Sequence, residues 1–297
     1  MPYRVKYDEM HPDEMRWIMS IKIVSDSSSD LMELAGADYA AVPLKIITGE
    51  KEYVDDAALD VSGMIGDLKK YKGESKSSCP NTEDWRAAFE DHDEIFCVTI
   101  TSNLSGSFNT ANLALNEHIR EKEGRQGHVI DTLSVGPESA LIIEKLQELI
   151  AQKLDFQEIK NKINEYKTRT HLIFSLESLR NLANNGRVSH AVAKLAGVLG
   201  IRMIGKASDQ GTLEMTNKSR GEERALSDIV KNLLKTGYEG GKLRIHHCQN
   251  LLAAEKLKAM IVKQFPAAMI KIQETRALCS FYAEAGGLLV GYEGARK

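Results

Sequence analysis

The sequence turns from strand to helix at Ile100-Thr-Ser-Asn-Leu-Ser105-Gly106-Ser107-Phe-Asn-Thr110, the stretch that says most about the fold. The apolar residues 95–100 are typical of a buried strand, and residues 111–115 are typical of a helix. Hydroxyl groups and one glycine therefore lie where the first backbone N–H groups of a helix are unpaired and the helix dipole is positive. Such a position favours an anion. Gly106 has no Cβ, so a ligand can approach the backbone closely.

The residues around Gly106 also limit which anion is expected. The segment contains no Lys or Arg, and the pattern GxxxxGK[ST] is absent from the chain. A carboxylate or a polar group is therefore favoured over a triphosphate with its magnesium ion. The alternative is that these Ser, Thr and Asn side chains are ordinary N-caps without a ligand. The segment alone leaves both interpretations open.

The composition is that of a globular protein with more than one domain. The chain has 297 residues, of which 42% are hydrophobic and 27% charged, and this length exceeds the usual size of one domain. The net charge is -3, from 39 basic and 42 acidic residues. A nucleic-acid partner is not expected, because it would require a surplus or stripe of basic residues.

Cysteine usage and hydropathy bear on where the chain works. The four cysteines form no CxxC pair, which is most simply explained by a reducing cytoplasm. No apolar run approaches the roughly 20 residues needed to span a bilayer, and no signal peptide is visible. Residues 1–20 have no clear period. We expect a peripheral N-terminal extension there, or an upstream start codon with the ordinary start at Met19.

The first half of the chain alternates strand and helix patterns. We expect an N-terminal α/β domain over residues 21–170, with a mostly parallel sheet and right-handed crossovers. Its details include one strand over residues 39–47, with Pro43 indicating an edge or a bulge. A short helix is expected to begin at a cap formed by Ser29 and Asp30 and to end at Gly36.

The second half has a different pattern. Residues 201–205 and 213–216 flank Ser208-Asp-Gln-Gly211, which is typical of a hairpin. Helix and strand patterns then alternate to the end of the chain, so we expect a second α/β domain with a mixed sheet over residues 171–297. The fold class is therefore α/β with two domains.

Several polar segments outside the Ser105 loop are candidates for a site. Ligands in open α/β sheets bind at the carboxyl ends of strands, and Asp26 follows the first strand. We favour a supporting role for Asp26, in which it holds neighbouring loops through backbone hydrogen bonds. Ser77 and Ser78 precede a capped helix and could converge with the Ser105 loop. Arg187 lies on a tight turn, where solvation is the commonest outcome.

Metal and covalent chemistry are not favoured. His246-His247-Cys248 resembles a metal cluster, but adjacent strand residues point to opposite faces and no matching pair exists elsewhere. The motif G-x-S-x-G is also absent. An enzyme that uses Ser105 or Asp26 on a small carboxylate or phosphorylated substrate remains the alternative to a binding protein. A third interpretation is that the chain carries another amphipathic ligand.

Taken together, these segments resemble the DegV family of fatty-acid-binding proteins from about Ile21 to the C-terminus. Each segment alone is weak evidence for the family, but the order and spacing of the segments together are specific to it. The segments are Ser25–Leu31, Val42–Lys45, Tyr53–Asp56, Ser77–Pro80, Ser102–Ser107, Ile130–Thr132, Leu179–Ser189, Ile201–Ile204 and Lys218–Gly221.

The resemblance implies two α/β domains with a long-chain fatty acid buried between them. Members present the acid to a separate fatty acid kinase catalytic subunit, which phosphorylates the carboxylate for phospholipid synthesis. The binding protein itself performs no bond chemistry, and no cofactor or metal is implied.

The resemblance also implies roles for individual residues. Ser77 and Ser105 would bind the carboxylate, with Ser78, Ser107 and Gly106 in support. The remaining implied residues are Arg187 near the head group, Arg220 for docking the kinase, and Tyr282 where many members have a histidine. A tyrosine hydroxyl still donates a hydrogen bond, but it is not a cation at neutral pH.

Overall fold

The computed structural model describes residues 21–196 and 200–297. A four-stranded parallel sheet forms the first layer, in the order β2-β1-β6-β7. Its strands are β1 (Ile21–Asp26), β2 (Asp38–Val42), β6 (Glu94–Thr99) and β7 (Gln126–Asp131). The expectations for residues 1–20 lie outside the described residues.

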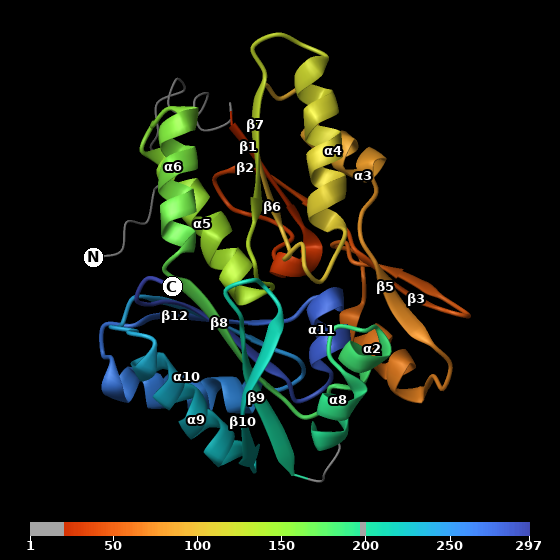
Figure 1. Ribbon diagram of the computed structural model, residues 1–297, viewed down its shortest axis with the longest axis vertical. Coiled ribbons are helices and arrows are strands. Elements are labelled where there is room, and N and C mark those ends of the chain that lie inside the picture. The colour runs from red at the N-terminus through yellow and green to blue at the C-terminus, as the bar shows by residue number, and fades with distance from the viewer. Residues whose placement is uncertain (1–20, 197–199) are drawn as a thin grey trace.

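Helices cover both faces of the parallel sheet (Figure 1). One face packs against α3 (Thr82–Phe89) and α4 (Ser107–Arg120) around the buried ring of Trp85. The other face packs against α5 (Pro137–Ala151) and α6 (Phe156–Lys167). Burial on both faces explains why the strands are nearly continuous apolar runs.

A six-stranded mixed sheet lies below the parallel sheet in Figure 1, in the order β10-β9-β8-β13-β11-β12. Only β11 and β12 pair in parallel. The strands are β8 (Thr170–Leu176), β9 (Ile201–Ala207), β10 (Leu213–Arg220), β11 (Lys242–His247), β12 (Met269–Glu274) and β13 (Leu288–Glu293). Helices α9 (Glu222–Lys235) and α10 (Leu251–Gln264) cover the outer face. The expected parallel first sheet and mixed second sheet are confirmed.

A small antiparallel sheet and short helices complete the described structure. The sheet has the order β4-β3-β5, from β3 (Lys45–Thr48), β4 (Glu52–Val54) and β5 (Ser75–Ser78). The helices are η2 (Ser27–Ser29), α2 (Val61–Lys70), α7 (Arg180–Asn184), α8 (His190–Ala196) and α11 (Ala277–Ala283). Met64 of α2 and Phe281 of α11 share one apolar cluster. Because α11 belongs to the C-terminal half, a domain boundary near residue 170 stays a prediction.

Two local expectations are wrong. Residues 39–47 form two strands, β2 and β3, which belong to different sheets. Pro43 lacks an N–H group and ends the first strand, and the next N–H, that of Leu44, donates to Ser27 Oγ at 3.0 Å.

The expected helix from Asp30 to Gly36 is also absent from the described residues, since Asp30 ends the short helix η2 instead of beginning one. Its φ of 62° places it in the left-handed region. Its carboxylate contacts the C-terminal half of the chain and is therefore not available as an N-cap.

Candidate functional site

An apolar cavity lies where the three sheets meet. The space inside it that no atom fills, counted together with the part open to solvent, is about 670 Å³. The apolar lining residues are Leu44, Ile100, Leu104, Val135, Leu172, Phe174, Leu176, Leu182, Leu213, Leu278, Ala283 and Leu289, with the thiol of Cys279. Among the described residues, four more polar side chains line the cavity, those of Ser77, Ser105, Arg187 and Tyr282.

Ser77 and Tyr282 meet at the polar part of this lining. Ser77 lies on β5, and its Oγ is 2.7 Å from the hydroxyl oxygen of Tyr282 on α11. Burial raises the pKa of Tyr282 from its ordinary value, so this hydroxyl is neutral at pH 7. It can therefore donate a hydrogen bond to a carboxylate, which a tyrosinate could not do.

Arg187 lines the same cavity and lies beside the Tyr282 ring. Gly186 adopts a φ of 74°, which a glycine tolerates without strain, and it ends the turn that brings Arg187 back to the cavity. Arg187 Nε donates to the carbonyl of Leu104 at 3.1 Å, and its Nη1 donates to the carbonyl of Asn185 at 2.5 Å. The guanidinium carbon is 5.9 Å from the centre of the Tyr282 ring. Arg187 is half-buried rather than simply solvated.

The Ser105 loop reaches the same cavity from the start of α4. Ser105 Oγ accepts the N–H of Ser107 at 3.3 Å. Gly106 precedes α4 and provides no side-chain cap, and a Cβ built there would lie 3.2 Å from Cys79 Sγ. Ser105 thus acts partly as a local cap, which was the alternative to a ligand site in the sequence analysis. It also lines the cavity.

Ser107 and Ser78 point elsewhere. Ser107 is buried, and its hydroxyl donates to Asp26 Oδ2 at 2.5 Å. Ser78 follows Ser77 on β5, so the two side chains leave opposite faces of the strand. Ser78 Oγ donates to the carbonyl of Cys79 at 3.3 Å, and Ser78 is not part of the cavity lining.

Asp26 binds the loops that surround the cavity. Its Oδ2 also accepts the N–H of Ile100 at 3.0 Å, while Oδ1 accepts both the N–H and the hydroxyl of Ser28. Burial is the main cause that raises the pKa of this carboxyl, and the hydrogen bonds from Ser107 and Ser28 oppose it. Asp26 has the geometry of a supporting residue, because both of its oxygens are occupied.

A polar cleft adjoins the cavity at Ser77 and opens to the surface. The cleft shares Ser77 and Arg187 with the cavity, and Tyr71, Lys76 and His190 are among its other lining residues. A group held between Ser77 and Arg187 is therefore reachable by another molecule.

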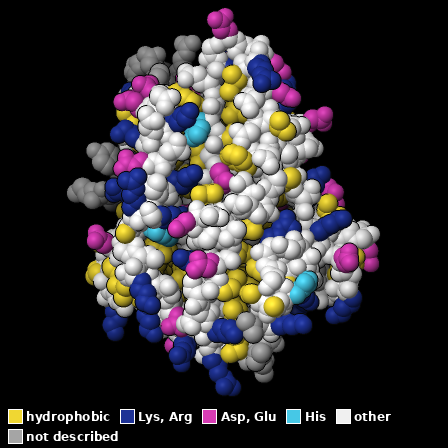
Figure 2. All heavy atoms as spheres, viewed as in Figure 1, with side chains coloured by type: hydrophobic (Ala, Val, Ile, Leu, Met, Phe, Trp, Pro, Cys, Tyr) yellow, Lys and Arg dark blue, Asp and Glu magenta, His cyan; other side chains and the backbone are white. Residues whose placement is uncertain are grey.

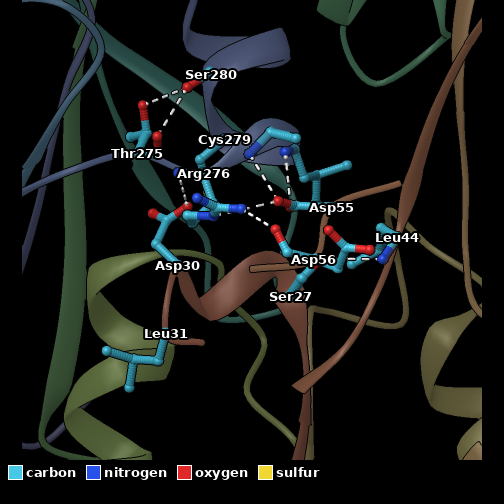
Figure 3. Close-up of polar contacts among 12 residues, drawn as sticks. Ser27, Asp30, Leu31, Leu44, Asp55, Asp56, Thr275, Arg276, Cys279 and Ser280 are labelled. Atoms are coloured by element: carbon cyan, nitrogen blue, oxygen red, sulfur yellow. Dashed lines mark hydrogen bonds and ion pairs between the residues drawn. The ribbon is translucent and has the colours of Figure 1, made fainter. Parts of the chain in front are cut away.

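Sequence reasoning missed the helix α11, which carries Tyr282. Asp55 accepts the N–H groups of Ala277 at 3.0 Å and of Leu278 at 3.2 Å, so a carboxylate from the N-terminal half caps this helix (Figure 3). The N–H of Arg276 donates to Asp30 at 2.7 Å, and its guanidinium lies between Asp55 and Asp56. The segment Tyr53–Asp56 was part of the family signature, but nothing in its own sequence indicated this partner.

Burial, opposed mainly by the hydrogen bonds from α11, raises the pKa of Asp55 to about 6. Folding therefore takes up a proton between the unfolded pKa near 4 and pH 6. We expect the unfolding free energy of the native chain to rise relative to that of Asp55→Asn as the pH falls from 7 to 4. The upper limit of this change is about 3 kcal/mol. Urea unfolding at several pH values measures the difference.

The control for this pH experiment is Asp56→Asn, because Asp56 is the exposed neighbour of Asp55. Its unfolding free energy should follow that of the native chain across the same pH range. If the difference in unfolding free energy between the native chain and Asp55→Asn stayed constant over this pH range, the raised pKa of Asp55 would be contradicted.

Arg220 lies away from the cavity, at the end of β10, and is exposed. Leu213, at the other end of the same strand, lines the cavity. Figure 2 shows Lys and Arg side chains gathered along the lower edge of the molecule, where α9 and β10 lie in Figure 1. The structure thus separates Arg220 from the residues around Ser77.

Within residues 21–196 and 200–297, no cluster of His, Cys, Asp and Glu has the composition to hold a metal ion. His246 instead pairs with Asp30, with Nδ1 2.7 Å from Oδ2 and both side chains fully buried. No helix in this part of the chain is long and apolar enough to cross a bilayer.

Comparison with known proteins identifies the family. The sequence profile described as "Uncharacterised protein, DegV family" matches residues 20–293. A DegV domain-containing protein of Streptococcus pneumoniae is 42% identical over 279 residues, which cover 93% of this chain and 99% of that protein.

Two solved structures are similar over the same region. A DegV family protein from Eubacterium eligens, loaded with heptadecanoic acid, has a TM-score of 0.91 and 43% identity, covering 93% of this chain and 100% of that one. The Streptococcus pneumoniae fatty acid kinase B3 protein, loaded with linoleic acid, has a TM-score of 0.91 and 42% identity, with the same coverage. The chain described here belongs to the DegV family.

Proposed function

We propose that this chain binds a long-chain fatty acid in the apolar cavity and presents its carboxylate to a separate kinase subunit. The observation that carries the proposal is the cavity itself, in which apolar side chains surround one polar group of Ser77, Ser105, Arg187 and Tyr282. The similar chains loaded with heptadecanoic and linoleic acid support the same class of ligand.

Burial of the acyl tail is expected to contribute more to the binding free energy than the hydrogen bonds to the carboxylate. Burial of a methylene contributes about 0.8 kcal/mol, so a C16 tail contributes roughly 10 kcal/mol before ordering costs. Hydrogen bonds to the charged carboxylate contribute about 1.5–3 kcal/mol each, and much of this offsets its desolvation. The hydroxyls of Ser77, Ser105 and Tyr282 therefore fix the position of the carboxylate more than they add to affinity.

The same arrangement disfavours the enzyme interpretation. A serine nucleophile needs a base within hydrogen-bonding reach, and the described side chains that line the cavity include no histidine and no carboxylate. Asp26 is 1% exposed and its oxygens are occupied by Ser28, Ile100 and Ser107. In the proposal, acyl phosphate formation for phospholipid synthesis takes place on the kinase subunit, with the carboxylate reached through the polar cleft.

A cytoplasmic location belongs to the proposal as well. All four cysteines are free, and three of them are buried, which fits a reducing compartment.

Native mass spectrometry of the purified chain, before and after organic extraction, tests the function. We expect one long-chain fatty acid per chain, lost on extraction and regained on addition of the acid. The acid should be phosphorylated only when a fatty acid kinase catalytic subunit and ATP are added. Another class of lipid would identify a different amphipathic ligand. An empty chain that converts a small carboxylate without a partner would support the enzyme interpretation.

Ser105→Ala should weaken fatty acid binding modestly, by about three- to tenfold, because one hydrogen bond to the carboxylate is lost. Phosphorylation by the kinase should fall further, since the carboxylate is no longer held in one position. Ser102→Ala, in the same loop, is the matched control and should change neither quantity. If Ser105→Ala left both binding and phosphorylation unchanged, the assignment of Ser105 to the head group would be wrong.

A further inference from the structure

The ring of Phe174 lies in the cavity wall against a glycine of the neighbouring strand. Phe174 is in register with Gly205 of β9 on one side and with Leu289 of β13 on the other. A Cβ built on Gly205 would overlap the Phe174 ring, and it would lie 2.8 Å from the carbonyl oxygen of Glu214. The ring therefore occupies the space that any other residue at position 205 would need.

Space, and not backbone conformation, is what requires a glycine here. Gly205 is not among the glycines that adopt a positive φ, so an alanine could adopt its dihedral angles. Two residues further along β8, Leu176 also lines the cavity, and its partner on β9 is Met203, which has a full side chain. Among the described β8 residues of the lining that are paired with β9, Phe174 is thus the one that faces a bare backbone.

We propose that Phe174 and Gly205 together set the length of the acyl chain that the cavity accepts. This inference rests on the proposed function, since it concerns the same cavity. Gly205 lets the aromatic ring lie against β9 and leaves the space beside it for the ligand. A side chain at position 205 would overlap the ring, and the carbonyl oxygen of Glu214 leaves that side chain no room to shift away. The ring would therefore have to move, and the space next to it is the cavity that it lines.

The test is the distribution of acids retained from an equimolar mixture of saturated C12 to C20 fatty acids, read by native mass spectrometry. Gly205→Ala should shift the distribution to shorter acids, and Phe174→Leu should shift it to longer ones. The expected change in the ratio of neighbouring lengths is about fourfold for each methylene gained or lost. Phe174→Leu provides the test even if Gly205→Ala disturbs the hairpin through Glu214.

Ile173→Val is the matched control, because Ile173 is the buried neighbour on the same strand that packs in the cluster on the opposite face of the sheet. It should leave the distribution unchanged. A native chain that retains no fatty acid would contradict the proposed function itself. A native chain that retains fatty acids with the same distribution as Phe174→Leu would overturn only the role of the Phe174–Gly205 pair.

Discussion

Shortening a saturated fatty acid from C16 to C10 is expected to weaken its binding to this chain by about three orders of magnitude. The six methylenes removed each contribute about 0.8 kcal/mol when buried, which together approach 5 kcal/mol. The expectation follows from a cavity whose described lining residues are apolar apart from the Cys279 thiol and the side chains of Ser77, Ser105, Arg187 and Tyr282. Displacement of a fluorescent fatty acid by each acid, below its micelle concentration, measures the two affinities.

Ser105→Ala provides the control for this experiment. It removes a contact to the carboxylate that both acids share, so it should lower both affinities and keep their ratio. Similar affinities of the native chain for the C10 and C16 acids would contradict the burial of the tail.

Asp26→Ala is expected to lower the free energy of unfolding by about 3 kcal/mol. The substitution leaves the N–H of Ile100 and the hydroxyls of Ser28 and Ser107 without their acceptor inside the protein. A buried group left unpaired costs about 1–3 kcal/mol. Part of this loss is offset, because the native chain no longer has to bury the Asp26 carboxyl, whose burial raises its pKa.

Urea unfolding at pH 7 measures the effect of Asp26→Ala. Asp56→Asn, which removes an exposed charge but keeps the side-chain oxygen that accepts the N–H of Ala58, should alter the stability by less than about 0.5 kcal/mol. Fatty acid affinity of folded Asp26→Ala should also fall, since Ser107 and the Ser105 loop lose their anchor. Unchanged stability would show that Asp26 does not hold these loops.

Local signals in the sequence were sufficient for the elements that depend on near neighbours. Helix α4 begins at Ser107, where the hydroxyl-rich loop predicts its start, and Asn81 caps α3 through the N–H of Asp84. The wrong elements depend on distant partners. Residues 45–47 leave the first sheet to pair with β4 and β5, and the carboxylate of Asp30 contacts His246 and Arg276 far along the chain.

The candidate site shows the same division. Ser105 was identified from its own segment, because a strand-to-helix turn rich in hydroxyls is a local pattern. Tyr282 came from the family resemblance, since its helix is capped by Asp55 and its hydroxyl contacts Ser77, 205 positions away. The pairing of Phe174 with Gly205 required the register of β8 and β9, which the two strand patterns do not specify.

The central claim is that the cavity holds a hydrocarbon tail while Ser77 and Ser105 hold the acid. A crystal structure of the chain with a C16 fatty acid tests it most directly. We predict carboxylate oxygens within hydrogen-bonding distance of Ser77 and Ser105, with the tail among the leucines and Phe174 of the cavity wall. A carboxylate far from both serines, or an acid bound outside this cavity, would contradict the account.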